Sequence, residues 1–327
     1  MKLTSKLQPD LLKSAVPQIP NRNGYGEGLK EAGDSNPKIV ALSADLTGST
    51  RTNVFSDVYP ERFIQIGVGE QNMASVASGM AAMGKIPFIA SYAMFSPGRS
   101  WEQVRTTIAY NESNVKIIGA HAGVSVGPDG ATHQAIEDIA LMRVIPNMVV
   151  LAPCDTYEAK KMTMWAADYD GPVYMRIARE KTPVVTTEDT PFVFGKLMTV
   201  LESDKDNQVT IISTGTLLYN ALDAGNQLNK AGINTTVAHL GTIKPLDKEA
   251  IIDAAKNSSL VVTVEEHQIA GGMGSAVAEC LSENHPIKIL RIGVDDAFGQ
   301  SGEPEELIAH YGMDAASIVD RVKHAIS

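Results

Sequence analysis

Short apolar segments alternate with helical segments along most of the chain, and this alternation restricts the possible folds more than any other feature. Short strands separated by helices of 10–15 residues indicate βαβ units and a parallel sheet. The strands expected in the first half are Lys38–Ala44, Phe63–Gly67, Ile86–Ala90, Val115–Ala120, Asn147–Leu151 and Val173–Ile177. The helices expected between them are Glu70–Met83 and windows near Gly98–Tyr110, His133–Val144 and Thr156–Ala167.

The segment Glu180–Phe194 interrupts the alternation, since it contains Lys-Thr-Pro and Thr-Thr-Glu-Asp-Thr-Pro and has no helical period. A second, shorter alternation follows it, at Val209–Ser213, Leu217–Ala231, Asn234–His239, Lys248–Ala255, Leu260–Val264, Gly274–Leu281, Ile287–Ile292 and a last helix from about Asp314. We therefore predict an α/β fold of two consecutive domains with mainly parallel sheets. Their boundaries are residues 1–185 and 197–327, with a linker at 186–196.

Composition excludes several classes of protein. The 327 residues carry 28 Lys and Arg against 38 Asp and Glu, a net charge of −10 that disfavours general nucleic-acid binding. No apolar segment approaches the ~18 residues that a membrane span needs. The first residues lack the apolar region of a secretory signal, so we expect the cytoplasm. Cys154 and Cys280 lie far apart, which excludes a disulfide scaffold and a cysteine-rich zinc site.

The first candidate motif is Ile66–Met73, where an expected strand ends in Gly67 and Gly69 and a helix begins at Glu70. Ligands of open α/β sheets bind beyond the carboxyl ends of the strands, so Glu70 is placed where chemistry usually occurs. The spacing alone leaves a simpler role open, in which a glutamate of the first turn complements the helix dipole.

The second candidate motif is the glycine-rich loop 121–134, which contains His121, Asp129 and His133. Its glycines allow sharp turns and a close approach of the backbone to a ligand. Two histidines and one aspartate over this length are a weak signal for a metal site, and an ordinary structured loop stays open as the alternative.

Two further groups follow expected strands. Asp45 stands among small hydroxyl residues, where a turn or a helix N-cap is the simpler explanation. Tyr92 and Phe95 follow the strand Ile86–Ala90 and could form a stacking wall, although a core pair is the alternative.

Phosphate-binding loops are missing from the sequence. No G-x-G-x-x-G sequence opens a helix after a strand, no Walker A sequence occurs, and Gly271–Gly274 has the wrong spacing. A chain of this type without such a loop suggests that another chain supplies it.

Taken together, four motifs resemble the C-terminal half of transketolase. They are Leu42-Ser-Ala-Asp-Leu, Gly67-Val-Gly-Glu70, the loop from His121 to Gln134, and Val264-Glu-Glu-His-Gln-Ile-Ala-Gly-Gly-Met-Gly. The resemblance covers nearly the whole chain. It implies that residues 1–185 form a pyrimidine-binding domain and residues 197–327 a transketolase C-terminal domain.

The resemblance also implies a cofactor and a partner. Transketolases use thiamine diphosphate, held between two domains that usually come from different subunits. The Gly-Asp-Gly…Asn motif that binds the diphosphate and a divalent metal is absent here, and the nearest sequence is Pro128–Gly130. The chain therefore resembles one subunit of a split transketolase, with the diphosphate and Mg²⁺ or Ca²⁺ held mainly by an N-terminal subunit in an α₂β₂ assembly.

Three positions match the residues of the family that surround the cofactor's pyrimidine ring. By the resemblance, Glu70 hydrogen-bonds N1′ of the aminopyrimidine, and Tyr92 and Phe95 pack around the ring. A carboxyl group that shares a proton with N1′ favours the imino form, whose nitrogen then accepts a proton from the thiazolium ring. A third aromatic residue of the family would align near Gly98 and is missing. Asp45 would lie near the cofactor.

The glycine-rich loop matches the sugar-binding loop of the family. By the resemblance, Asp129 contacts the donor hydroxyl next to the carbonyl group. His133 assists proton transfer at the substrate oxygens, and His121 helps to hold the phosphate.

Arg22, Ser49 and Arg179 match the remaining phosphate binders. Guanidinium groups bind phosphate oxygens in a fork geometry that lysine does not reproduce. Arg176 competes with Arg179 for this match. We favour Arg179 because it stands seven residues after Pro172, as in the family.

The activity that the resemblance implies is transfer of a two-carbon ketol unit from a ketose phosphate to an aldose phosphate. The β-subunit of a 2-oxo acid dehydrogenase E1 component is the nearest alternative, but its substrate carries no sugar phosphate. A deoxyxylulose-phosphate synthase tends to carry an acid at the position of His121. A non-catalytic partner subunit is the alternative from another class, and the presence of Glu70 argues against it.

Overall fold

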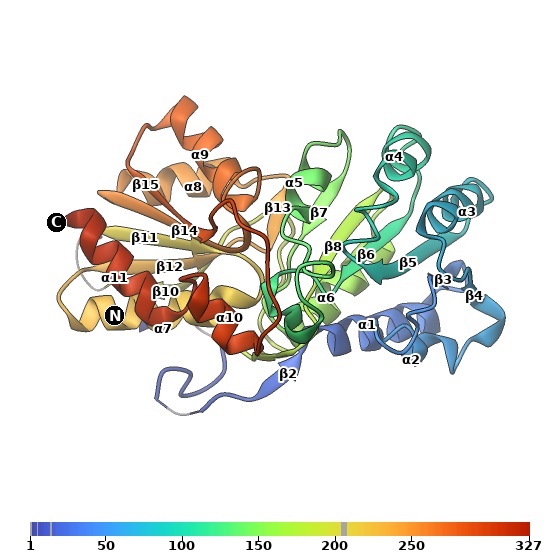
Figure 1. The fold of residues 1–327 in the computed structure, drawn as a ribbon, viewed down its shortest axis with the longest axis horizontal. Helices are drawn as coiled ribbons and strands as arrows, with labels where there is room; N and C mark the ends of the chain where they lie inside the picture. The colour runs from blue at the N-terminus through green and yellow to red at the C-terminus, as the bar shows by residue number, and fades with distance from the viewer. Residues whose placement is uncertain (1, 5, 14, 204–207) are drawn as a thin grey trace.

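A computed structural model describes residues 2–4, 6–13, 15–203 and 208–327. Its ribbon shows two α/β bodies side by side (Figure 1). The first is built on a seven-stranded sheet and the second on a six-stranded sheet, and both sheets are mainly parallel, which confirms the predicted fold class. Within the described residues, no helix combines the length and apolar character needed to cross a membrane.

The first sheet has the strand order β13-β7-β8-β6-β5-β3-β4. The strands are β3 (Ile39–Ser43), β4 (Phe63–Gln65), β5 (Ile86–Tyr92), β6 (Lys116–Ala120), β7 (Val149–Leu151), β8 (Val173–Ile177) and β13 (Thr242–Lys244). β3, β6 and β8 are buried over their whole length. Helices cover both faces of such a sheet, so its strands are apolar throughout instead of alternating.

The helices of this body include α1 and α2, which the sequence did not predict. They are α1 (Asn21–Ser35), α2 (Asn53–Ser56), α3 (Glu70–Ala82), α4 (Trp101–Gln103) with a π-helical turn η2 (Val104–Ala109), α5 (Asp138–Arg143) and α6 (Thr156–Asp168), with short 3-10 turns η1 (Pro60–Arg62) and η3 (Val124–Asp129). α1 is glycine-rich, which lowers intrinsic helix propensity. Its glycines allow close packing on α6, because a side chain at Gly24 would overlap the carbonyl group of Thr156.

The second body has the strand order β1-β10-β12-β11-β14-β15. The strands are β1 (Lys2–Leu3), β10 (Met198–Glu202), β11 (Val209–Ser213), β12 (Thr235–His239), β14 (Leu260–Gln268) and β15 (Ile289–Val294). The helices are α7 (Leu218–Lys230) with the preceding 3-10 turn η4 (Gly215–Leu217), α8 (Lys248–Lys256), α9 (Met273–Asn284), α10 (Pro304–His310) and α11 (Ala315–Ile326).

Each sheet includes an edge strand from the part of the sequence that otherwise builds the other body. β1, at the N-terminus, pairs antiparallel with β10 of the second sheet, and β13, beyond the linker, pairs antiparallel with β7 of the first. β2 (Gln18–Pro20) and β9 (Lys181–Pro183) pair with each other in a two-stranded sheet. The boundaries at residues 1–185, 186–196 and 197–327 remain a prediction about the sequence domains.

Two predicted segments differ from the structure. The expected helix His133–Val144 begins only at Asp138, because Ala135 forms a bridge with Ala122 and draws the chain into an extended conformation. The segment Glu180–Phe194, which interrupts the alternation in the sequence, contains the short strand β9, and residues 184–197 contain neither helix nor strand.

Candidate active site

The carboxyl ends of four parallel neighbours, β3, β5, β6 and β8, meet at one edge of the first sheet. Side chains that follow these strands are therefore brought together, as in other open α/β sheets. Three residues near this edge have left-handed backbone, with φ of 61° at Asp45, 66° at Arg51 and 57° at His121. Backbone strain of this kind is concentrated at functional sites.

Ser49 is the centre of a hydrogen-bonded group at this edge. Its Oγ lies 2.8 Å from His121 Nε2 and 3.1 Å from the hydroxyl group of Tyr92. Arg22 Nη1 donates to its carbonyl oxygen over 2.7 Å. Four of the residues predicted from the sequence, separated by up to about a hundred positions in the chain, thus contact one another.

Aromatic rings form a wall beside this group. Tyr92 and Phe95 are nearly parallel, with an interplanar angle of 7° and ring centroids 6.2 Å apart. The ring of His133 meets both edge-on, at 5.8 Å and 5.5 Å. The wall therefore brings Tyr92 and Phe95, which are candidates for contact with the cofactor, together with His133, which is a candidate for contact with the substrate.

The site is cationic around His121. Burial, followed by the charges of Arg22 and Arg179, lowers the pKa of His121 to about 3, so its imidazole ring is neutral near pH 7. Its Nδ1 is buried and has no partner among the described residues. Two guanidinium groups and an unsatisfied imidazole nitrogen suit a ligand that carries an anionic oxygen.

Arg179 and Arg176 have different surroundings. Arg179 is partly exposed and donates to Asp129 Oδ1 over 3.0 Å, which joins two candidate substrate residues. Arg176 is buried, pairs with Asp138 at 3.0 Å and donates to the carbonyl oxygen of Glu266. The geometry therefore favours Arg179 over Arg176 as a phosphate ligand.

Glu70 is the first residue of α3, and its side chain is 1% exposed. Ser91 donates to Oε1 over 3.2 Å, and Arg99 Nη1 donates to Oε2 over 3.1 Å. The guanidinium group of Arg99 also lies 5.0 Å from the centre of the Phe95 ring. A buried carboxyl group beside stacked rings suits a flat heterocycle with a ring nitrogen.

Asp45 stands apart from these groups. Its side chain is exposed, and its backbone N–H donates to Gln65 Oε1 over 2.8 Å. Within the described part of the chain, no hydrogen bond or ring contact joins its carboxyl group to the other candidate residues. A role for Asp45 near the cofactor remains a prediction.

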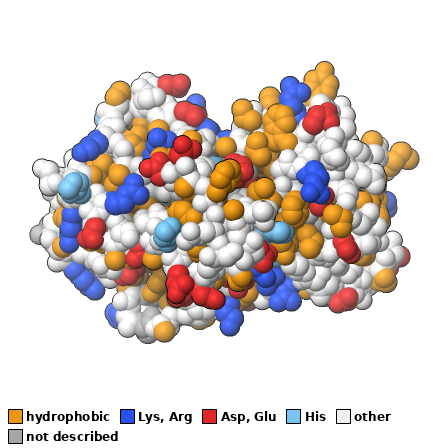
Figure 2. Space-filling model, viewed as in Figure 1, with side chains coloured by type: hydrophobic (Ala, Val, Ile, Leu, Met, Phe, Trp, Pro, Cys, Tyr) orange, Lys and Arg blue, Asp and Glu red, His pale blue; other side chains and the backbone are white. Residues whose placement is uncertain are grey.

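A groove of about 550 Å³ adjoins the aromatic wall and is lined by Ala93, Met94, Phe95, Gly98, Arg99, Ala135, Glu137, Asp138 and Leu141. Figure 2 shows hydrophobic side chains gathered on this face, around the positions of α4 and α5 in Figure 1. Nearby loops expose Tyr110 and Val144, 83% and 67% of whose surface is accessible. Exposed apolar surface next to a candidate site is typical of an interaction surface.

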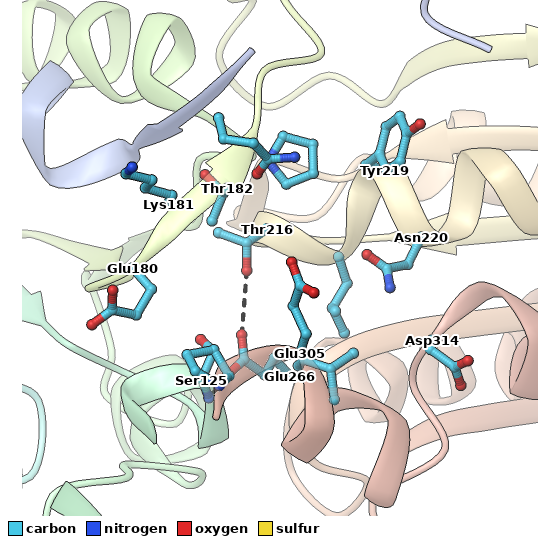
Figure 3. Close-up of a pocket in the computed structure, with 15 residues that line it drawn as sticks. Ser125, Glu180, Lys181, Thr182, Thr216, Tyr219, Asn220, Glu266, Glu305 and Asp314 are labelled. Carbon is cyan, nitrogen blue, oxygen red and sulfur yellow. Dashed lines mark hydrogen bonds between the residues drawn. The ribbon is translucent and has the colours of Figure 1, made fainter. Parts of the chain in front are cut away.

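The second body holds the glycine-rich loop in place. Glu266 on β14 is buried, and its Oε1 accepts a hydrogen bond of 2.6 Å from the backbone N–H of Ser125 in η3. Its other oxygen accepts from Thr216 over 3.2 Å, at the wall of a pocket of about 320 Å³ between the two bodies (Figure 3). Gly123 has φ of 91°, and a side chain there would overlap the Glu266 carboxyl group.

The structure also explains why the segment Gly271–Gly274 is rich in glycine. The carboxyl group of Glu265 accepts hydrogen bonds from the backbone N–H groups of Met273 and Gly274, at 2.6 Å and 2.8 Å, where α9 begins. A side chain at Gly272 would overlap this carboxyl group. The segment therefore binds the protein's own carboxylate at a helix N-terminus.

Sequence reasoning missed Arg51, Ser91 and Arg99. Arg99 could have been found, since it directly follows Gly98, where the third aromatic residue of the family is missing. Arg51 adds to the positive field at Arg22 and donates to Asn23 over 3.0 Å. Ser91 lies inside a strand and gave no signal.

Comparison with known protein families identifies two domains. Residues 17–185 match the model of the transketolase pyrimidine-binding domain, and residues 198–318 match that of the transketolase C-terminal domain.

Individual proteins give the same result. The chain is 47% identical over 304 residues to a protein of Methanocaldococcus jannaschii provisionally described as a transketolase C-terminal section, covering 92% of this chain and 94% of the relative. It is 39% identical to the 6-deoxy-6-sulfo-D-fructose transketolase subunit of Clostridium sp. (strain MSTE9), covering 94% of each. It is 35% identical to human transketolase, covering 95% of this chain but 49% of the relative.

Among solved structures, a split-gene transketolase described as an inactive β₄ tetramer superposes with a TM-score of 0.85 at 42% identity. The match covers 94% of this chain and 98% of that one.

Proposed function

The chain belongs to the transketolase family, and we propose that it is the subunit of a split transketolase that supplies the pyrimidine-binding half of a shared active site. The observation that carries this proposal is the buried carboxyl group of Glu70 beside the stacked rings of Tyr92 and Phe95, at the edge of the first sheet where the parallel strands end. All three residues fall within 17–185, the range that matches the transketolase pyrimidine-binding domain, and this supports the proposal.

The share of each relative's length that this chain covers supports the existence of a partner chain. The chain spans nearly the whole of the archaeal and clostridial relatives but about half of human transketolase. The other half, which carries the diphosphate and metal motif in the family, would come from an N-terminal subunit, in an α₂β₂ assembly with Mg²⁺ or Ca²⁺ bound mainly by the partner. The groove beside Phe95 and Arg99 offers that subunit an apolar face.

The residues present fit the pyrimidine part of thiamine diphosphate. Glu70 would hydrogen-bond a ring nitrogen, and Tyr92 and Phe95 would pack against the ring face. When bound, the cofactor supplies an acidic ring carbon and an electron sink for cleavage of the bond next to a carbonyl group. The protein orients the ring and exchanges a proton at the Glu70 carboxyl group.

The positively charged side chains around His121 fit the phosphate of a sugar. Arg22, Arg179 and Ser49 would bind phosphate oxygens together with neutral His121, whose Nδ1 lacks a partner among the described residues. Asp129, already tied to Arg179, and His133, on the aromatic wall, would contact the hydroxyl groups and oxygens nearer to the reacting carbons. We propose ketol transfer between sugar phosphates on this basis.

Reconstitution tests the proposal. The chain alone should show no ketol transfer, and addition of a subunit with the Gly-Asp-Gly motif, thiamine diphosphate and Mg²⁺ should produce it from a ketose phosphate to an aldose phosphate. Activity of the chain without a partner would refute the shared site. A stable complex that binds cofactor but transfers no ketol unit from any sugar phosphate donor would refute the reaction.

A further inference from the structure

Three side chains capable of binding a metal lie together between the two bodies. Cys154 lies two residues before α6 and Glu158 in the first turn of that helix, both in the first body, and His239 ends β12 in the second. One donor atom of each lies within 4.8 Å of the other two, and all three side chains are buried. None of them has a role in the proposed ketol transfer.

From this geometry we propose that Cys154, Glu158 and His239 form a structural Zn²⁺ site that fastens the two bodies to each other. A thiolate, an imidazole and a carboxylate are the donor types that zinc binds in proteins. Bonds of about 2.0–2.3 Å in a tetrahedral site hold the ligand atoms roughly 3.3–3.8 Å apart. The donor atoms already lie within 4.8 Å of one another, so shifts of about 1 Å would bring them to that spacing.

Zn²⁺ would take the place of the proton that His239 shares with Glu158, whose Oε2 also accepts from the backbone N–H of Cys154 over 2.7 Å. His239 Nε2 lies 2.8 Å from Glu158 Oε2, while His239 Nδ1 is buried and has no partner among the described residues. Gly241 is packed against both groups, and a side chain there would approach them to 2.9 Å and 3.0 Å. A cavity of about 150 Å³, lined in part by Glu158, His239 and Gly241, can admit a water molecule as the fourth ligand.

Zinc would stabilise the contact between the bodies. The buried pair of Glu158 and His239 already joins the bodies at this point, and removing one partner of such a pair is strongly destabilising. An ion that binds the folded chain and not the unfolded one raises stability by mass action. Zn²⁺ is therefore expected to raise the Tm of the whole chain by a few degrees.

Cobalt substitution tests the site on the full chain. After removal of metal with a chelator, titration with Co²⁺ should give a thiolate-to-cobalt charge-transfer band that saturates at one ion per chain, and Zn²⁺ should abolish it. Cys154→Ser should remove the band and His239→Gln should weaken binding at least tenfold. Cys280→Ser is the matched control, because Cys280 is the other cysteine of the chain and should leave the band unchanged.

The outcomes are distinct. A band that persists in Cys154→Ser, or no band in the wild-type chain, would overturn the site, and so would a Tm that Zn²⁺ does not change. If Cys154→Ser fails to fold by circular dichroism, His239→Gln carries the same comparison. These measurements need neither the partner subunit nor catalysis, so they are independent of the proposed function.

Discussion

The buried carboxyl group of Glu70 accepts a hydrogen bond of 3.1 Å from the guanidinium group of Arg99, whose side chain is half exposed. Arg99 also lies over the Phe95 ring. The residue that the sequence singled out for proton exchange is therefore held by a cation of its own chain, at the margin of the apolar groove.

Removal of Arg99 should lower stability. Arg99→Ala leaves the Glu70 carboxyl group buried without its cation, so we expect the free energy of unfolding to fall by about 1–3 kcal/mol in urea denaturation. Arg105→Ala removes an exposed arginine nearby and should change it by less than about 0.5 kcal/mol. Equal effects of the two variants would contradict a stabilising ion pair.

Glu70→Ala should slow proton exchange at the reactive carbon of the bound cofactor by about 10²–10⁴-fold in the reconstituted enzyme. The reason is loss of the carboxyl group that shares the ring-nitrogen proton. Exchange of deuterium, followed by NMR at saturating cofactor, measures the effect. Gln71→Ala, at the exposed next position of α3, is the control. Unchanged exchange in Glu70→Ala would exclude its proposed role.

Arg179→Ala should raise KM for a phosphorylated donor about 10–100-fold more than for its unphosphorylated analogue, since charge-assisted hydrogen bonds contribute about 1.5–3 kcal/mol. Steady-state kinetics of the reconstituted enzyme with both donors test this. Lys181→Ala removes an exposed cation two residues away and should affect the two donors equally. The phosphate contact is wrong if Arg179→Ala also affects both equally.

Gly123→Ala should disrupt the glycine-rich loop. Position 123 has φ of 91°, and an added methyl group would overlap the Glu266 carboxyl group. Gly84→Ala is the matched control, because φ is 82° there but nothing lies within 4 Å of an added Cβ. Both variants lose about 1 kcal/mol from backbone strain. Only Gly123→Ala should also reduce kcat/KM, by tenfold or more, and equal kcat/KM values would show that the loop tolerates the overlap.

Lys116 should make stability depend on pH. Its Nζ is buried and donates to the carbonyl groups of Tyr169 and Gly171. Burial lowers the pKa of Lys116 from 10.5 to about 7. Between these values the unfolded chain binds the extra proton, so this group makes the free energy of unfolding rise with pH.

Lys116→Met should remove that rise. Urea denaturation at about pH 7 and about pH 9.5 should show a wild-type-minus-variant difference that grows with pH. Lys85→Met, at an exposed position, should follow the wild type at both values. A difference that is constant with pH would mean that Lys116 titrates normally.

The local pattern of residues was sufficient to predict four strands of the first sheet and insufficient to predict helix α1. The apolar strands β3, β5, β6 and β8 are found where the sequence predicts them, because burial on both faces leaves a run of apolar residues. The helix α1 was missed, because four of its fifteen residues are glycines and only packing on α6 overcomes their low propensity.

The sequence by itself determined that the chain is two α/β bodies and that Glu70, Tyr92 and His121 lie at or just beyond strand ends, since periodicity and turn residues are local properties. The tertiary structure decided which side chains meet. Ser125 and Glu266, 141 residues apart, lock the glycine-rich loop 121–134 to the second body, and Arg99 pairs with Glu70 across 29 positions of the chain. These contacts depend on how elements distant in the sequence pack against one another, and that packing is a property of surfaces rather than of any stretch of sequence.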